Sequence, residues 1–111
     1  MTACAAATVM AVLAGCLSGA SSAAGNETIT DAEALVIVHR HCSACHAARP
    51  AHPAFDKPPN GVTLETIADL RKYASRIYAQ TVQNKAMPLG NQAGMTDDER
   101  AALGRWLKAM P

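Results

Sequence analysis

The stretch Cys-Ser-Ala-Cys-His at residues 42–46 constrains this chain more than any other feature of its sequence. In a helix, Cys42, Cys45 and His46 take positions i, i+3 and i+4, so their side chains lie on one side of the cylinder. Three interpretations fit this spacing: a redox dithiol, part of a zinc site, and an attachment point for haem. The rest of the sequence favours one of them.

The chain has few large side chains with which to build a core. Among its 111 residues the only aromatic ones are Phe55, Tyr73, Tyr78 and Trp106, and much of its hydrophobic half is alanine. We therefore expect one small domain with a thin core, which usually needs a disulfide, a metal or a cofactor for stability. The net charge of +1 gives no sign of a nucleic-acid-binding surface.

The first twenty-five residues carry no charged side chain, which predicts an export segment. Residues 1–24 are expected to be a signal peptide or a lipoprotein signal or anchor, and residues 25–111 the mature domain. The sequence LAGC at residues 13–16 resembles a bacterial lipobox, in which Cys16 becomes lipidated, whereas cleavage after Ala24 is the other possibility. No Lys or Arg precedes this stretch, as one normally does in a signal peptide. Export predicts a protein that is periplasmic or anchored to a membrane facing the periplasm.

Apolar residues recur at three- and four-residue steps, which predicts helices joined by loops. Thr30 and Glu33 have the spacing of a capping box and predict the start of the first helix. A second helix is expected from about residue 64 to residue 84, and a third over residues 96–110. The first helix is expected to carry Leu35, Val38, Cys42 and Cys45 on one face.

Prolines crowd the segment 48–63, and the segment 85–95 holds a proline and two glycines, so both are expected to be loops. Thr96 and Glu99 form a further capping box after the second loop. No stretch alternates with the period of a strand. The predicted fold class is therefore all-α.

The absence of predicted strands bears on the cysteine motif. A thioredoxin-like dithiol is expected in a βαβ setting, and a zinc site needs more ligands than His52 can add without a second cysteine pair. Haem c needs two thiols that add to its two vinyl groups and a neighbouring imidazole that reaches the iron. C-x-x-C-H is the spacing of c-type haem attachment, so the sequence favours covalent attachment through Cys42 and Cys45, with His46 as an axial ligand.

Met87, in the loop sequence KAMPLG, is the candidate for the second axial ligand. A thioether is a suitable ligand for haem iron, and the following proline restricts the backbone. Met95 is the rival, but its place before the Thr96 cap suits a hydrophobic staple. Met110 is expected in the core, and His39 and His41 at the surface or the haem edge.

The segments CSACH, PPNGVTLET and KAMPLGNQAGMTDDERAALGRWL together resemble the C-terminal cytochrome c domain of bacterial membrane-bound urate oxidases, the urate hydroxylases. The resemblance runs from about residue 34 to residue 110. It implies a small class I-like cytochrome c fold, with three to four helices around one covalently bound haem, and His46 and Met87 as the axial pair. The multi-span membrane domain of that family is absent from this sequence, so urate oxidation is not carried over.

With both axial positions taken, the expected function is transfer of one electron on a single haem c per chain, as a carrier and not as an enzyme. A redox partner protein is expected, such as a membrane oxidase or dehydrogenase. Two alternatives stay open: a detached cytochrome subunit of a membrane urate-oxidising complex, and a haem sensor or peroxidase-like protein with a displaceable Met87.

Three further expectations concern the surroundings of the haem. His46 should donate its free N–H to a backbone carbonyl of the proline loop, around residues 50–53. Six residues should wall the porphyrin: Leu35, Ile67, Leu70, Ile77, Leu103 and Trp106. Six basic residues form either a rim that steers an acidic partner or ordinary solvated faces: Arg40, Arg49, Arg71, Lys72, Arg76 and Lys85.

Overall fold

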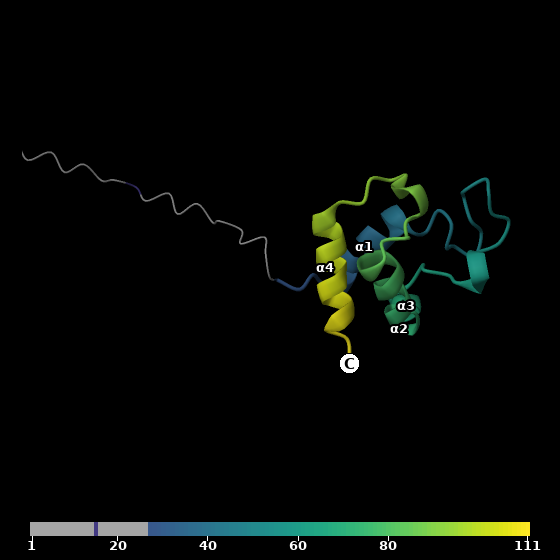
Figure 1. The fold of residues 1–111 in the computed structure, drawn as a ribbon. Helices are drawn as coiled ribbons and strands as arrows, with labels where there is room; N and C mark the ends of the chain where they lie inside the picture. Colours follow the sequence, from purple (N-terminus) through teal and green to yellow (C-terminus); the bar gives the residue numbers. More distant parts are fainter. Residues whose placement is uncertain (1–14, 16–26) are drawn as a thin grey trace, which may run out of the picture.

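The structure of the protein is a computed structural model that describes Gly15 and residues 27–111 (Figure 1). Apart from Gly15, the predicted export segment of residues 1–24 lies outside the described residues, as do Cys4 and Cys16. Lipidation of Cys16 and cleavage after Ala24 therefore stay predictions.

Residues 27–111 form helices and no strands, which confirms the all-α prediction. The α-helices are α1 (Asp31–His41), α2 (Ile67–Lys72), α3 (Ala74–Ile77) and α4 (Asp97–Lys108). A π-helical segment, η2 (Tyr78–Gln83), follows α3, and two short 3₁₀ turns are η1 (Pro59–Gly61) and η3 (Leu89–Asn91). Within the described part of the chain, no helix is both long enough and apolar enough to cross a lipid bilayer.

The two capping boxes predicted from the sequence are confirmed. Thr30 accepts a hydrogen bond from the Glu33 backbone N–H, and the Glu33 carboxylate accepts one from the Thr30 N–H. Thr96 and Glu99 form the same reciprocal pair at the start of α4. Each pair satisfies backbone donors that a helix start leaves free, so both helices begin where the sequence predicts.

The single second helix expected over residues 64–84 is wrong, because the chain forms α2, α3 and η2 instead. The Leu64 N–H donates to the His46 carbonyl at 2.6 Å, which keeps this residue out of a helix. Helix α2 starts at a third capping box, between Thr66 and Asp69. The usual sequence pattern has Glu or Gln three residues after the capping Thr, so Asp69 does not match it. Tyr73, with φ −105° and ψ 14°, separates α2 from α3.

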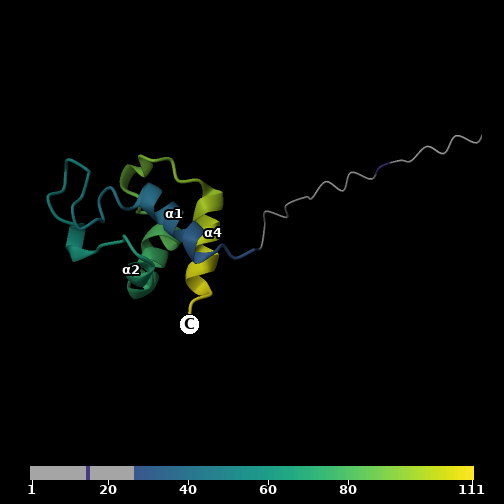
Figure 2. The same ribbon diagram turned by 180° about the vertical axis from the view of Figure 1, so that it is seen from behind.

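Helix α4 lies across α1 and beside η2, so the two ends of the described domain pack together (Figures 1 and 2). Gly104 allows the closest approach, since a Cβ there would meet the Val82 side chain at 3.2 Å. The core is small and consists of Ala34, Val38, Val62, Leu64, Leu70, Ile77, Met95, Leu103, Trp106 and Leu107. The long connection from α1 to α2 projects away from these helices as a wide loop (Figure 1).

The buried face of α1 differs from the predicted one. Ala34, Val38 and His41 are buried, whereas Leu35 and Cys42 are half-buried. The buried face is therefore turned by about one residue from the expected one, and the His41 ring on it bonds Glu99 of α4. A histidine is a poor signal for a core position in a sequence pattern.

Candidate functional site

The cysteine motif lies just beyond the end of α1, in a turn and not in the helix that the sequence predicts. Helix α1 ends at His41, and Cys42 is its C-cap residue. The backbone N–H groups of Cys45 and His46 both donate to the Cys42 carbonyl, at 3.2 and 2.9 Å. The chain thus makes one further helical turn, which keeps the i, i+3, i+4 arrangement that the spacing requires.

His46 has its imidazole held by the backbone. Nδ1 lies 2.9 Å from the Val62 carbonyl oxygen, and a carbonyl only accepts, so Nδ1 carries the proton and donates it. Nε2 then has a lone pair and is available as a ligand. The prediction of a backbone carbonyl partner is confirmed, but its placement in residues 50–53 is wrong. Val62 follows η1, and the Leu64 N–H bond to the His46 carbonyl brings this segment alongside the motif.

A cavity of about 480 Å³ brings the four predicted site residues together. Cys42, Cys45 and His46 line it from the motif turn, and Met87 lines it from the loop after η2. Its volume lies in the range of about 300–1,000 Å³ that is usual for ligand and cofactor pockets. Residues far apart in the sequence thus meet at one site.

The two cysteines are not joined in a disulfide. Burial raises the pKa of the Cys42 thiol to about 12, with a smaller contribution from the neighbouring Cys45. At neutral pH this thiol is therefore protonated. Redox dithiols and metal-binding cysteines act as thiolates, and reactive cysteines have a lowered pKa. The burial of Cys42 therefore disfavours the interpretation as a reactive redox dithiol.

Met87 is half-buried, and both of its backbone polar groups are bonded. Its N–H donates to the Gln80 carbonyl at 2.9 Å, and its carbonyl accepts from Arg100 Nη1 at 2.8 Å. Two segments of the fold therefore hold the peptide of this residue.

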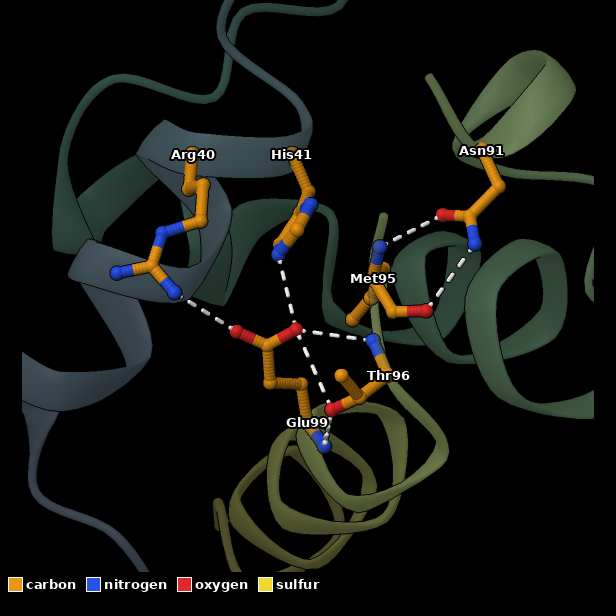
Figure 3. A network of polar contacts seen from close by, with 6 residues as sticks. All are labelled: Arg40, His41, Asn91, Met95, Thr96 and Glu99. Carbon is orange, nitrogen blue, oxygen red and sulfur yellow. Dashed lines mark hydrogen bonds and ion pairs between the residues drawn. The ribbon is translucent and has the colours of Figure 1, made fainter. Parts of the chain in front are cut away.

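Met95 differs from Met87 in its surroundings. It is only 4% exposed, belongs to the core and does not line the cavity. The Asn91 side chain accepts from its N–H and donates to its carbonyl (Figure 3). Met110 is half-buried against the core, away from the cavity. Of the three methionines considered, the structure brings Met87 to the motif.

Of the two positions expected for His41, the surface is wrong, because its ring is buried against Glu99, whereas the haem edge stays a prediction. Its side chain is 1% exposed and also lines the cavity. Nε2 lies 3.0 Å from the Glu99 carboxylate, which also accepts from Arg40 at 3.0 Å and from the Thr96 N–H (Figure 3). The hydrogen bond from the Thr96 N–H is the largest influence that holds the pKa of the Glu99 carboxyl below its ordinary value. His41 and Arg40 lower this pKa further. Glu99 thus joins α1 to α4.

His39 and His52 are both tied by hydrogen bonds. His39 is exposed, as expected, and bonds the Glu65 carbonyl through Nε2 at 2.8 Å. His52 accepts from the Ala54 N–H through Nδ1, so its Nε2 carries the proton and donates to Gln92 at 3.2 Å. This bond links the two loops that border the cavity, both of which contribute lining residues.

Of the six residues expected to wall a porphyrin, only Ile77 lines the cavity. The other five pack in or against the core. Segments that the sequence analysis assigned to loops supply much of the apolar lining instead. These residues include Phe55, Pro59, Val62, Pro88 and Leu89.

The basic residues do not gather around the cavity. Only Arg40 and Arg76 of the six line it. Three of the six form ion pairs: Arg40 with Glu99, Arg71 with Asp31, and Lys85 with Asp97. Such exposed pairs contribute little to stability, and the arrangement favours ordinary solvated faces over a basic rim.

Comparison with family models, with curated proteins and with solved structures found no significant match to this chain. In the part of the chain that the structure describes, no three His, Cys, Asp or Glu side chains are grouped so as to hold a metal ion. The zinc interpretation, which needs about four such ligands, therefore gains no support from the arrangement of residues 27–111.

Proposed function

We propose that the chain is a small c-type cytochrome with a class I-like fold, which carries one electron on a covalently attached haem. The observation that carries this proposal is the meeting of Cys42, Cys45, His46 and Met87 at one cavity of about 480 Å³. Local sequence places the first three together, but only the fold brings Met87 to them. C-x-x-C-H is the spacing of c-type haem attachment.

The residues at the cavity fit a covalent haem. Cys42 and Cys45 are the proposed attachment points, and the protonated, buried thiol of Cys42 suits a residue that becomes a thioether in an apolar setting. The hydrogen bond from His46 Nδ1 to Val62 sets the tautomer and the orientation of the ring, so that Nε2 is the atom offered to the iron. Met87 supplies a thioether from a loop whose peptide is bonded on both sides.

A His/Met-ligated haem iron exchanges one electron between its ferrous and ferric states and keeps no position open for a substrate. The chain's own contribution is to exclude water with the apolar lining and to hold both axial side chains in place. As part of the same proposal the chain is exported, faces the periplasm either free or through an N-terminal anchor, and exchanges electrons with a partner protein.

The test is to produce the full chain with cytochrome c maturation machinery and to stain for haem after denaturing electrophoresis. We expect one haem per wild-type chain, retained through denaturation, and no stain in the double variant Cys42→Ser, Cys45→Ser. Ser43→Ala is the matched control, because it changes one of the two residues between the cysteines and leaves both thiols.

Two results would contradict the proposal. The first is a colourless wild-type protein whose thiols remain free to titrate. The second is a coloured protein that lacks the methionine–iron band and binds carbon monoxide or cyanide at low concentration, which would favour the haem sensor or peroxidase-like alternative.

A further inference from the structure

Arg100 is a buried arginine whose charged end meets the Met87 loop. It lies in the first turns of α4 and is 9% exposed. One nitrogen, Nη1, lies 2.8 Å from the Met87 carbonyl oxygen and 2.8 Å from the Thr81 carbonyl oxygen. A terminal guanidinium nitrogen carries two hydrogens, so each carbonyl accepts one of them.

The burial of this charge needs compensation. Removing a guanidinium from water is costly unless its donors are bonded. No acidic side chain among residues 27–111 forms an ion pair with Arg100, since the carboxylates in ion pairs there bond Arg40, His41, Arg71 and Lys85. The two backbone carbonyls are therefore its partners, and both bonds are short and charge-assisted.

The two carbonyls belong to the segments that place Met87. The Thr81 carbonyl lies in the last turn of η2, where helical carbonyls have no following helical N–H to bond. The Met87 N–H donates back to Gln80 of the same segment. Arg100 thus ties the end of η2 and the Met87 peptide to α4 through one nitrogen.

We infer that Arg100 is the positioning residue that holds Met87 in place as an axial ligand, an inference that rests on the proposed function. A thioether is a neutral ligand that an added ion can displace. The fraction of molecules in which the thioether binds the iron therefore depends on how often the Met87 loop moves away from it. Arg100 fixes the backbone carbonyl of the sulfur-bearing residue itself, and this bond is lost when the loop opens.

The experiment uses the full, matured protein and compares Arg100→Met with Arg105→Met. Arg105 lies on the same helix and donates no hydrogen bond to Thr81 or Met87. The two readouts are the methionine-to-iron charge-transfer band of the ferric protein and the dissociation constant for cyanide. Neither readout responds to a loss of stability that leaves the iron ligands in place.

We expect Arg100→Met to keep its covalent haem, to lose or weaken the band, and to bind cyanide about tenfold or more tightly, since two charge-assisted bonds are lost. The affinity for an added ligand rises in proportion to the fraction of molecules in which Met87 has left the iron. Arg105→Met should stay within about twofold of the wild type in both readouts, because Arg105 bonds neither of the two carbonyls that Arg100 holds.

An Arg100→Met protein with the wild-type band and wild-type cyanide affinity would overturn the inference. If that variant does not accumulate, Arg100→Gln decides the question, because a shorter and neutral amide cannot supply the two charge-assisted bonds that Nη1 makes to Thr81 and Met87. A band and a cyanide affinity unchanged in the glutamine variant would overturn it equally. A wild-type protein without haem or without the band is a failure of the proposed function, and it is seen before any variant is made.

Discussion

At the scale of single residues, the site depends on backbone groups as much as on the side chains that the motif names. His46 takes its tautomer from the Val62 carbonyl, at 2.9 Å. Met87 takes its place from Gln80 and Arg100. A carbonyl partner can come from any residue type, so no sequence pattern indicates which one it is. The two proposed axial residues could be named from the sequence, but the atoms that orient them could not.

Met87→Leu and Met95→Leu test the proposal that Met87, and not Met95, is the second axial ligand. Both changes nearly conserve the side-chain volume and should lower the free energy of unfolding by less than about 1.5 kcal/mol. We expect Met87→Leu to lower the reduction potential and to bind carbon monoxide when reduced, because the thioether no longer closes the iron. Met95→Leu should change neither the reduction potential nor the binding of carbon monoxide, since Met95 is buried in the core. Redox titration and carbon monoxide difference spectra check both, and the reverse pattern would reassign the ligand.

At the scale of elements, the starts of the helices follow from local sequence more closely than their lengths do. The starts of α1, α2 and α4 are each set by a capping box contained within four residues. The expected helix over residues 64–84 breaks up because Leu64 bonds the motif and the chain turns at Tyr73. Propensity favours one continuous helix there, and tertiary contacts override it.

The capping box that the sequence search missed can be tested by Thr66→Ala. Loss of the N-cap side chain should lower the free energy of unfolding by about 1 kcal/mol, because the Asp69 N–H loses its acceptor at 3.1 Å. Denaturant unfolding followed by circular dichroism measures the effect. Thr28→Ala is the control, since Thr28 is exposed and precedes the first helix. Equal stability of the two variants would contradict a structural role for this cap.

At the scale of the whole molecule, the first and last helices of the described domain are joined by polar contacts at both ends. Glu99 bonds His41 and Arg40 at one end, and Asp31 accepts from Trp106 at 3.0 Å and pairs with Arg71 at the other. The small core alone is a weak source of stability, and the exposed ion pairs among these links add little, so we expect the proposed haem to contribute a large share.

Because the Glu99 carboxylate joins α4 to α1, we expect the protein to become less stable at acid pH. The pKa of Glu99 in the folded protein is below its ordinary value of 4.5. Its contribution is therefore fully present above pH 4.5 and is lost as the pH falls through the lower, folded-state pKa. Glu99→Gln should lower the free energy of unfolding by about 1–2 kcal/mol at pH 7.

The difference in unfolding free energy between Glu99→Gln and the wild type should narrow below pH 4.5, where Glu99 becomes protonated first in the unfolded state and, at lower pH, in the folded state as well. Urea unfolding at a series of pH values measures it. Glu27→Gln is the control, because Glu27 is exposed and makes no hydrogen bond or ion pair within residues 27–111. A difference that stays constant down to the lowest pH would show that Glu99 acts through packing and not through its charge.

The sequence by itself determined the helical class, the capping boxes at Thr30 and Thr96, and the four residues proposed to bind haem. These features depend on residue types, and mostly on residues within one helical turn of each other, where local geometry decides what can meet. Only the tertiary structure decided that Val62 orients His46, sixteen positions away, that Arg100 holds Met87, thirteen positions away, and that His41 is buried against Glu99, fifty-eight positions away. Contacts at such separations depend on how the helices pack. The packing of a small core results from many weak interactions, and the spacing of residues in the sequence does not predict their sum.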